Sequence, residues 1–153
     1  MAKRIAIGAD HGGYKLKEEI KAMLKKARYK IQDMGTDSSD SCDYPEFGHK
    51  VAKQVSERKA DKGIVICRSG IGMTIVANKV PGVRAGNCST IREAKSAREH
   101  NDTNVLSLAA DKISVSKAKD ITKVWLKTKA LKGRHARRVN QIKKQEKKDF
   151  RKR

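Results

Sequence analysis

The sequence predicts an α/β fold with one parallel sheet between two layers of helices, and three observations support it. Short apolar runs begin near residues 5, 30, 64, 83 and 105, and segments with helical periodicity separate them. Each separation leaves room for a crossover that returns the chain to the same edge of a sheet. Residues 64–66 are apolar throughout, as in a strand covered on both faces. The expected architecture is a doubly wound, Rossmann-like three-layer αβα sandwich with a five-stranded parallel sheet and a C-terminal helix.

The elements follow from the pattern in chain order. The expected strands are residues 5–7, 29–34, 64–66, 83–86 and 105–108. The first two helices carry Leu16, Ile20 and Leu24, and then Phe47, Val51 and Val55 behind Pro45 in the first turn. A third helix is expected at 73–79, after two glycines end the strand. Three more helices are marked by apolar residues at helical spacing. The first carries Ile91, Ala94 and Ala97, the second carries Ala118, Ile121 and Trp125, and the third carries Ala136, Val139 and Ile142.

A chain of 153 residues fits one domain, which we place at residues 1–142, followed by a basic, flexible tail at 143–153. Lysine and arginine total 37 against 17 acidic residues, a net charge of +20, and residues 132–153 alone carry +9. Such a surface attracts phosphorylated metabolites, nucleic acid or anionic membranes. Aromatic residues make up only 4%, which leaves few platforms for base stacking and disfavours nucleic acid as the partner. The alternative is that the positive charge only reflects a solvated, lysine-rich surface and serves no particular partner.

Several functional classes are excluded by what the sequence lacks. No apolar stretch approaches the roughly 18 to 20 residues of a membrane span, and the N-terminal segment has no secretory h-region. The three cysteines cannot all pair, and none has a Cys-x-x-Cys spacing, so we expect a cytoplasmic protein without a zinc site. The glycine pattern from Gly70 is not a dinucleotide fingerprint, because Ile75 stands at its third position. No cofactor and no metal are expected.

Two loops rich in polar groups should meet at the carboxyl edge of the sheet, where such folds bind ligands. The first is Asp-His-Gly-Gly at 10–13 and the second is Cys-Arg-Ser-Gly-Ile-Gly-Met-Thr at 67–74. The glycines allow a sharp turn with inward N–H groups, and the following helix N-terminus favours an anion. An oxyanion or a phosphate is the expected ligand.

Cys67 ends its strand beside Arg68 and a helix N-terminus, a setting that favours a thiolate acting as nucleophile or base. The alternative is that Cys67 is only the last buried residue of an apolar strand. Cys42 and Cys88 have no comparable setting.

A second polar group comprises His100, Asn101, Arg134 and Arg138. The two arginines are four residues apart, so on a helix they share a face, either as a phosphate clamp or as part of a solvated basic surface. His100 precedes the fifth strand and should lie at the amino edge of the sheet, opposite Cys67. If both are catalytic, the active site should be shared between two subunits.

Six segments resemble the type B ribose-5-phosphate isomerases and the related galactose-6-phosphate isomerase subunits. They are 7–13 (IGADHGG), 43–45 (DYP), 67–73 (CRSGIGM), 77–84 (ANKVPGVR), 97–106 (AREHNDTNVL) and 133–135 (GRH). The resemblance runs from residue 5 to about residue 139, and the combination is far more specific than any one segment.

The resemblance implies a metal-free aldose–ketose isomerase of the pentose phosphate pathway, a homodimer or homotetramer acting on a phosphorylated sugar. It implies that Cys67 is the base that moves a proton between C1 and C2 through an enediolate, and that His100 assists ring opening. Implied substrate contacts are Asp10, His11, Tyr44 and Asn101, the backbone of the loop Arg68, Ser69, Gly70, Ile71 and Gly72, and the phosphate-binding Arg134 and Arg138. Ser69 keeps the hydroxyl of a common threonine and is counted with the catalytic residues.

The sequence also departs from the family pattern. Arg68 replaces a common glycine, Asp111 replaces an arginine of the phosphate site, and Met73 replaces the glutamate that some members use as base. Two alternative functions therefore stay open: an isomerase of allose or galactose 6-phosphate, and a non-enzymatic protein that binds nucleic acid through the basic tail.

Overall fold

The computed structural model describes residues 3–150, and in that range it confirms the expected α/β sandwich with a C-terminal helix. The strands are β1 (Arg4–Ala9), β2 (Lys30–Asp33), β3 (Lys62–Cys67), β4 (Ala85–Asn87) and β5 (Val105–Ala109). The helices are α1 (Tyr14–Lys26), α2 (Tyr44–Ser56), α3 (Ile71–Asn78), α4 (Ile91–Asn101), α5 (Val115–Lys127) and α6 (Arg134–Phe150). All described pairings are parallel, in the order β2-β1-β3-β5-β4.

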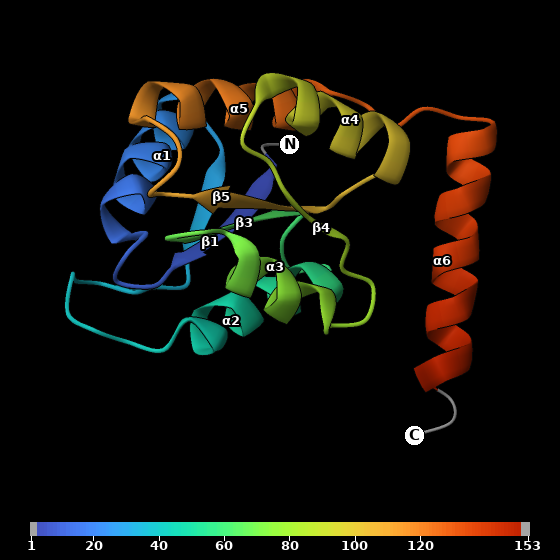
Figure 1. Ribbon diagram of the computed structural model, residues 1–153, viewed down its shortest axis with the longest axis horizontal. Helices are drawn as coiled ribbons and strands as arrows, with labels where there is room; N and C mark the ends of the chain where they lie inside the picture. The colour runs from blue at the N-terminus through green and yellow to red at the C-terminus, as the bar shows by residue number, and fades with distance from the viewer. Residues whose placement is uncertain (1–2, 151–153) are drawn as a thin grey trace.

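The sheet separates two helical layers, with α1, α4 and α5 on one face and α2 and α3 on the other (Figure 1). Alternate residues of the central strand supply the two cores, as the pleat of a strand requires. Ile64 and Ile66 join the core under α1 and α5, whereas Val65 and Cys67 join the core under α2 and α3. The uninterrupted apolar run at 64–66 is explained by this two-sided burial.

Several element boundaries differ from the prediction by one or two residues, and two of these differences have local causes. The fourth strand begins at Ala85 rather than residue 83, because the Arg84 N–H donates to the Asn104 side chain, 2.8 Å away, instead of a strand neighbour. The third helix begins at Ile71 rather than residue 73, because Gly70 adopts the left-handed conformation with φ +75° and turns the chain at once.

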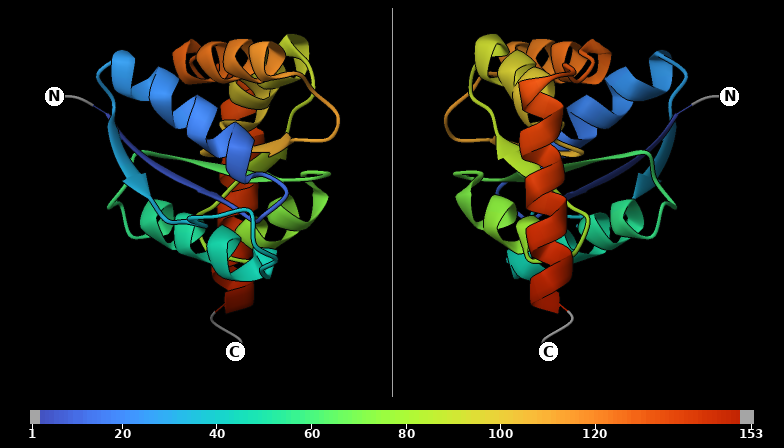
Figure 2. Two further views of the ribbon diagram at one scale, coloured as in Figure 1. Left: turned by 90° about the vertical axis from the view of Figure 1, so that its left-hand side faces the viewer. Right: turned by 90° about the vertical axis from the view of Figure 1, so that its right-hand side faces the viewer.

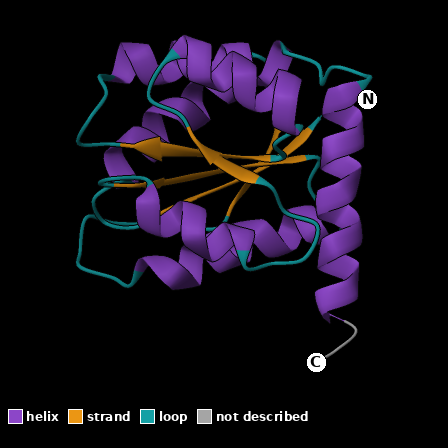
Figure 3. Cartoon of the chain, turned by 45° about the vertical axis from the view of Figure 1, so that its right-hand side comes forward, coloured by secondary structure: helices purple, strands orange, loops and turns teal. Residues whose placement is uncertain are grey.

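The last helix stands at the side of the sandwich, and α6 packs against α4 along its first half (Figures 2 and 3). Val139 is its buried residue. The boundary predicted at residue 142 falls inside α6, so residues 143–150 continue a helix, while 151–153 lie outside the described range.

No helix within residues 3–150 has both the length and the apolar character needed to cross a membrane.

A buried ion pair fixes α1 to the carboxyl edge of the sheet. The Lys17 ammonium is fully buried and lies 2.7 Å from both carboxylate oxygens of Asp33, at the end of β2. The same carboxylate accepts hydrogen bonds from Lys21 and from the Gly35 N–H. Burial alone would raise the pKa of Asp33, but the lysine contacts outweigh it and hold the pKa below the ordinary value of 3.8.

We expect Asp33→Asn to lower the free energy of unfolding at pH 7 by about 2 kcal/mol, since it removes the nearer carboxylate from the buried Lys17 ammonium and leaves Glu18, 3.2 Å away, as the remaining ion pair. Because the folded-state pKa of Asp33 is depressed, its contribution is fully present above about pH 3.8 and is lost as the pH falls through the folded value. The free energies of unfolding of the wild type and Asp33→Asn, measured by urea denaturation, should therefore converge as the pH is lowered.

Asp120→Asn is the matched control, because within residues 3–150 the Asp120 carboxylate makes only an exposed 3.8 Å contact with Lys123. Equal losses in the two variants at pH 7 would contradict a structural role for the buried pair.

Candidate active site

Cys67 lies at the carboxyl end of β3, in the turn that leads into α3. Its residue surface is 6% exposed in the single chain. The Gly70 N–H donates a hydrogen bond to Sγ at 3.2 Å, so the sulfur is oriented as an acceptor facing the turn. Cys67 is thus the last buried residue of β3, and its sulfur is also a hydrogen-bond acceptor for the turn that follows the strand.

Two consecutive peptides of this turn are held by side chains from other elements. The Ser69 carbonyl accepts from Asn87 Nδ2 at 3.2 Å, and the Gly70 carbonyl accepts from Ser107 Oγ at 2.8 Å and from Thr74 Oγ1 at 2.7 Å. In a trans peptide the N–H points opposite to the carbonyl. Holding these two carbonyls therefore fixes the N–H groups of Gly70 and Ile71, which face Cys67 Sγ and Ser69 Oγ.

The N-terminus of α3 leaves donors available for an anion. The N–H groups of Gly72 and Met73 meet no acceptor within residues 3–150, because the first turn of a helix has no preceding carbonyls to use. They follow directly after the Cys67 turn, so a negatively charged oxygen near Sγ would find N–H donors and the positive end of the helix.

The first loop adjoins this turn. The Asp10 N–H donates to the Ile66 carbonyl at 3.2 Å, and the Asp10 carboxylate accepts from the Gly13 N–H at 3.0 Å. His11 Nδ1 accepts the Cys42 N–H at 3.2 Å, which places the proton of the neutral ring on Nε2. Tyr44 lies against the start of α3, since a Cβ built on Gly72 would lie 2.7 Å from the Tyr44 ring.

Two of the departures from the family pattern face each other. Arg68 Nη1 lies 3.5 Å from Asp111 Oδ1, and both side chains are exposed. The Arg68 methylenes also cover Gly12, where a Cβ would lie 2.5 Å from Cγ. The added positive charge beside Cys67 is thus accompanied by an added negative charge, and an exposed pair of this kind contributes little to stability.

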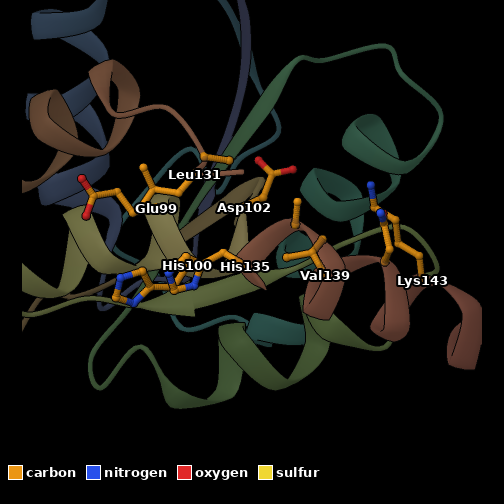
Figure 4. Close-up of a pocket in the computed structure, with 10 residues that line it drawn as sticks. Glu99, His100, Asp102, Leu131, His135, Val139 and Lys143 are labelled. Carbon is orange, nitrogen blue, oxygen red and sulfur yellow. The ribbon is translucent and has the colours of Figure 1, made fainter. Parts of the chain in front are cut away.

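His100, Asn101, Arg134 and Arg138 form a second group at the other edge. A capping box between Thr90 and Glu93 begins α4, which ends at Asn101 directly after His100. His100 stacks on His135 of α6, with ring centroids 4.4 Å apart and planes within 8° (Figure 4). Both rings line a small cavity of about 90 Å³. Partial burial and the neighbouring His100 and arginine side chains lower the pKa of His135, which favours a neutral ring.

One chain does not bring the two groups together. In the β3–β5 ladder Gly63 pairs with Val105 and Cys67 pairs with Ala109. Four residues of strand span about 13 Å, so Cys67 lies that far from the edge at which α4 delivers His100 to the start of β5. The predicted placement of His100 and Cys67 on opposite edges agrees with this register.

The other two thiols differ from Cys67. Burial, with a smaller effect of Glu93, raises the pKa of Cys88 to about 12, so its thiol stays protonated at neutral pH. Cys42 lies 3.9 Å from His11 through its sulfur and contributes its backbone N–H to that ring.

Sequence reasoning missed Ser107, Asn87 and the role of the Cys42 backbone. Ser107 left a usable signal: it is a polar residue in the middle of the apolar strand 105–109, and a buried hydroxyl requires a hydrogen-bond partner. Asn87 and Cys42 act across 18 and 31 residues of chain, a pairing that local pattern does not contain.

Within residues 3–150 no group of three or more histidine, cysteine or acidic side chains has the arrangement of a metal site.

A thiol and open N–H donors at the carboxyl edge of a parallel sheet are features expected of an α/β enzyme site for a small anionic substrate. Residues 5–142 match the model of the ribose/galactose isomerase family, and the chain belongs to this family. The resemblance seen in the sequence is thereby confirmed.

Individual relatives agree over nearly the whole chain. Ribose-5-phosphate isomerase B of Escherichia coli is 43% identical over 140 residues, covering 92% of this chain and 94% of that protein. The structure of ribose-5-phosphate isomerase B of Clostridium thermocellum is 50% identical, covers 95% of this chain and 98% of that one, and superimposes with a TM-score of 0.93. The Mycoplasma genitalium ribose-5-phosphate isomerase B, solved with bound ribulose-5-phosphate, is 37% identical over 96% and 98% of the two chains, with a TM-score of 0.93.

We expect Gly70→Ala to destabilise the fold by about 2–3 kcal/mol, because it adds a clash to an unfavourable left-handed conformation. The new Cβ would lie 2.5 Å from the Asn87 amide oxygen. Gly133→Ala is the matched control: φ is +67° and no atom of the described residues lies within 4 Å of the added Cβ, so only the conformational cost of about 1 kcal/mol remains.

Chemical denaturation measures both variants. In Gly70→Ala/Asn87→Ala the clash is removed, and the loss should be smaller than the sum of the two single losses. Additive losses, or equal losses for the two glycine variants, would show that Asn87 does not constrain the turn.

Proposed function

We propose that this chain interconverts ribose 5-phosphate and ribulose 5-phosphate, a step of the pentose phosphate pathway. The observation that supports it most strongly is the Cys67 turn, in which a thiol lies among N–H groups oriented by Asn87 and Ser107. Ribose-5-phosphate isomerase B is the name of relatives 36–50% identical to this chain, and one was solved with ribulose-5-phosphate. We assign the activity to residues 1–142, with 143–153 as a basic extension, and the free cysteines fit a cytoplasmic location.

In the proposed reaction the Cys67 thiolate removes the proton from C2 of the open-chain aldose. The electron pair forms the C1–C2 double bond, and the negative charge passes to O1, giving an enediolate. The thiol then returns the proton to C1, while the hydroxyl proton of O2 moves to O1 and leaves a carbonyl at C2. We assign this oxygen-to-oxygen transfer to the Ser69 hydroxyl, which lies in the same turn.

Stabilising the enediolate matters more than the strength of the base, because a hydrogen next to a carbonyl is only weakly acidic. N–H donors fixed in advance toward a developing oxyanion contribute most to such reactions. The open N–H groups of Gly72 and Met73 and the helix N-terminus supply them here.

The remaining roles follow the two groups of side chains. Asp10, His11 and Tyr44 contact the sugar beside Cys67. We propose that His100 assists ring opening, that Asn101 binds the sugar, and that Arg134 and Arg138 bind the phosphate. Since the two groups lie at opposite edges, each complete site would combine the Cys67 group of one copy with the His100 group of another, in a homodimer or a dimer of dimers.

The surface beside Cys67 is consistent with coverage by a second copy. Ile71 and Ile75 lie one turn apart on α3 and are 53% and 55% exposed. Adjacent exposed isoleucines at the entrance of a site are more typical of an interface than of open solvent.

An isomerase of galactose or allose 6-phosphate is the second candidate, because the family model covers both ribose and galactose enzymes. Comparing kcat/KM on ribose 5-phosphate and on the two hexose 6-phosphates decides between them. Higher values on a hexose phosphate would replace the pentose assignment.

We expect Cys67→Ala to lower kcat on ribose 5-phosphate by at least about a thousandfold, because it removes the proposed base. Cys88→Ala is the control, a second buried thiol that takes no part in the reaction. Circular dichroism and the thermal midpoint establish that both variants are folded. Activity of Cys67→Ala within a factor of ten of wild type would reject the assigned base.

Mixing two inactive variants tests the shared site. Cys67→Ala and His100→Ala damage different groups, so a mixed dimer contains one intact site and one doubly damaged site. Unfolding and refolding equal amounts together should restore about a quarter of wild-type activity, while each variant treated alone stays inactive. No recovery, with mixed dimers demonstrated by mass spectrometry, would place both residues in a site within one chain.

A further inference from the structure

A second, larger cavity lies farther along α6, at the amino edge of the sheet. It is a groove of about 690 Å³ between the second half of α6 and the residues that precede β1, β3, β4 and β5 or begin them. Cys67 does not line it, and it shares only Lys143 with the small cavity at His100. Its volume lies in the range of small-molecule sites.

The groove carries an excess of positive charge. Five cationic side chains line it, Arg4, Arg58, Arg84, Lys143 and Lys147, against the carboxylates of Asp61 and Glu146. Arg4 is paired with Asp61 at 3.1 Å, and Arg84 is paired with Asp102 at 3.2 Å. Arg58, Lys143 and Lys147 form no ion pair with any residue of the range 3–150. Three cations are therefore available to a ligand.

The neutral polar groups of the groove are already engaged. Ser56 Oγ donates to the Pro81 carbonyl at 2.6 Å, and the Asn104 amide donates to the Gly82 carbonyl and accepts from the Arg84 N–H. No aromatic side chain among residues 3–150 lines the groove. A base would find no stacking surface there, and each of these neutral side chains is already held in place by a hydrogen bond within the chain.

One anion of the chain itself already occupies part of the groove. Both oxygens of the Glu146 carboxylate lie 3.0 Å from the Gly82 N–H, which donates to them. This contact joins the second half of α6 to the turn before β4. It shows that negatively charged oxygens fit between the Gly82 backbone and the lysines of α6.

We propose that this groove binds a compact ligand that carries two or more phosphate groups. Several charged oxygens match three uncompensated cations, and the guanidinium of Arg58 can hold a phosphate through two parallel hydrogen bonds. A ligand placed between α6 and the body would also hold the helix that carries the Arg134–Arg138 pair. That consequence for activity rests on the proposed isomerase function, whereas the binding itself does not.

The probe is inorganic pyrophosphate, titrated calorimetrically into the full-length protein at low ionic strength. We expect Lys147→Gln to weaken binding about five- to tenfold, as for loss of one charge-assisted contact. Lys144→Gln is the matched control: it makes the same charge change one turn earlier but does not line the groove, and it should change the affinity less than about twofold.

A second pair of variants tests whether the Glu146 carboxylate competes with the ligand for the groove. Glu146→Gln removes the competing negative charge and should tighten pyrophosphate binding about two- to fivefold, whereas Asp149→Asn on the same helix should leave it unchanged. Cys67→Ala, which abolishes the proposed isomerase reaction, should still bind pyrophosphate normally.

Three results would overturn the proposal: no binding to the wild type, equal weakening by the two lysine variants, or full competition between ribose 5-phosphate and pyrophosphate. Isomerase rates measured on the same samples report separately on the proposed function.

Discussion

The hydrogen bonds to the Ser69 and Gly70 carbonyls fix the orientation of the peptide groups around the Cys67 thiol. Ser107 reaches the Gly70 carbonyl from β5, and Asn87 reaches the Ser69 carbonyl from the end of β4. A peptide flip at either position would turn an N–H away from the thiol or from Ser69 and replace it with a carbonyl oxygen. The structure of the Cys67 turn therefore depends on the strand order, because β5 must be the neighbour of β3, and β4 the neighbour of β5, for both contacts to form.

The same strand order separates the two functional groups. Parallel strands place every strand-to-helix turn at one edge and every helix-to-strand turn at the other. Cys67 belongs to the first kind of turn and His100 to the second. Within a single copy the length of the strands separates Cys67 from His100. A two-fold axis can instead place the carboxyl edge of one copy against the amino edge of the other. The proposed sharing of the site thus follows from topology rather than from any single contact.

The sequence predicted the features that depend on local pattern and chain order. The two-sided burial of residues 64–66, the glycine turn after Cys67 and the opposite edges of Cys67 and His100 all follow from periodicity and from the parallel sheet. It did not predict contacts between distant residues, such as the pairing of Arg68 with Asp111 or the Ser107 hydrogen bond to Gly70. Such contacts depend on strand register to within one residue, and periodicity indicates strands without their register.

The helix α6 is where the proposed phosphate contacts and the basic groove meet. Its arginines lie in the first two turns, and Lys143 lines both the His100 cavity and the groove. Little apolar surface holds the helix in place, since Val139 is its buried residue and the His100–His135 stack and the Glu146 carboxylate are polar contacts. An element held mainly by polar contacts has low local stability, so its position responds to small changes in charge. If the proposed ligand binds in the groove and the arginines bind the phosphate of the sugar, both events would act on the same helix, and charge neutralisation in the groove would then be coupled to phosphate binding. The basic residues along α6 would thereby have a role beyond that of a solvated surface.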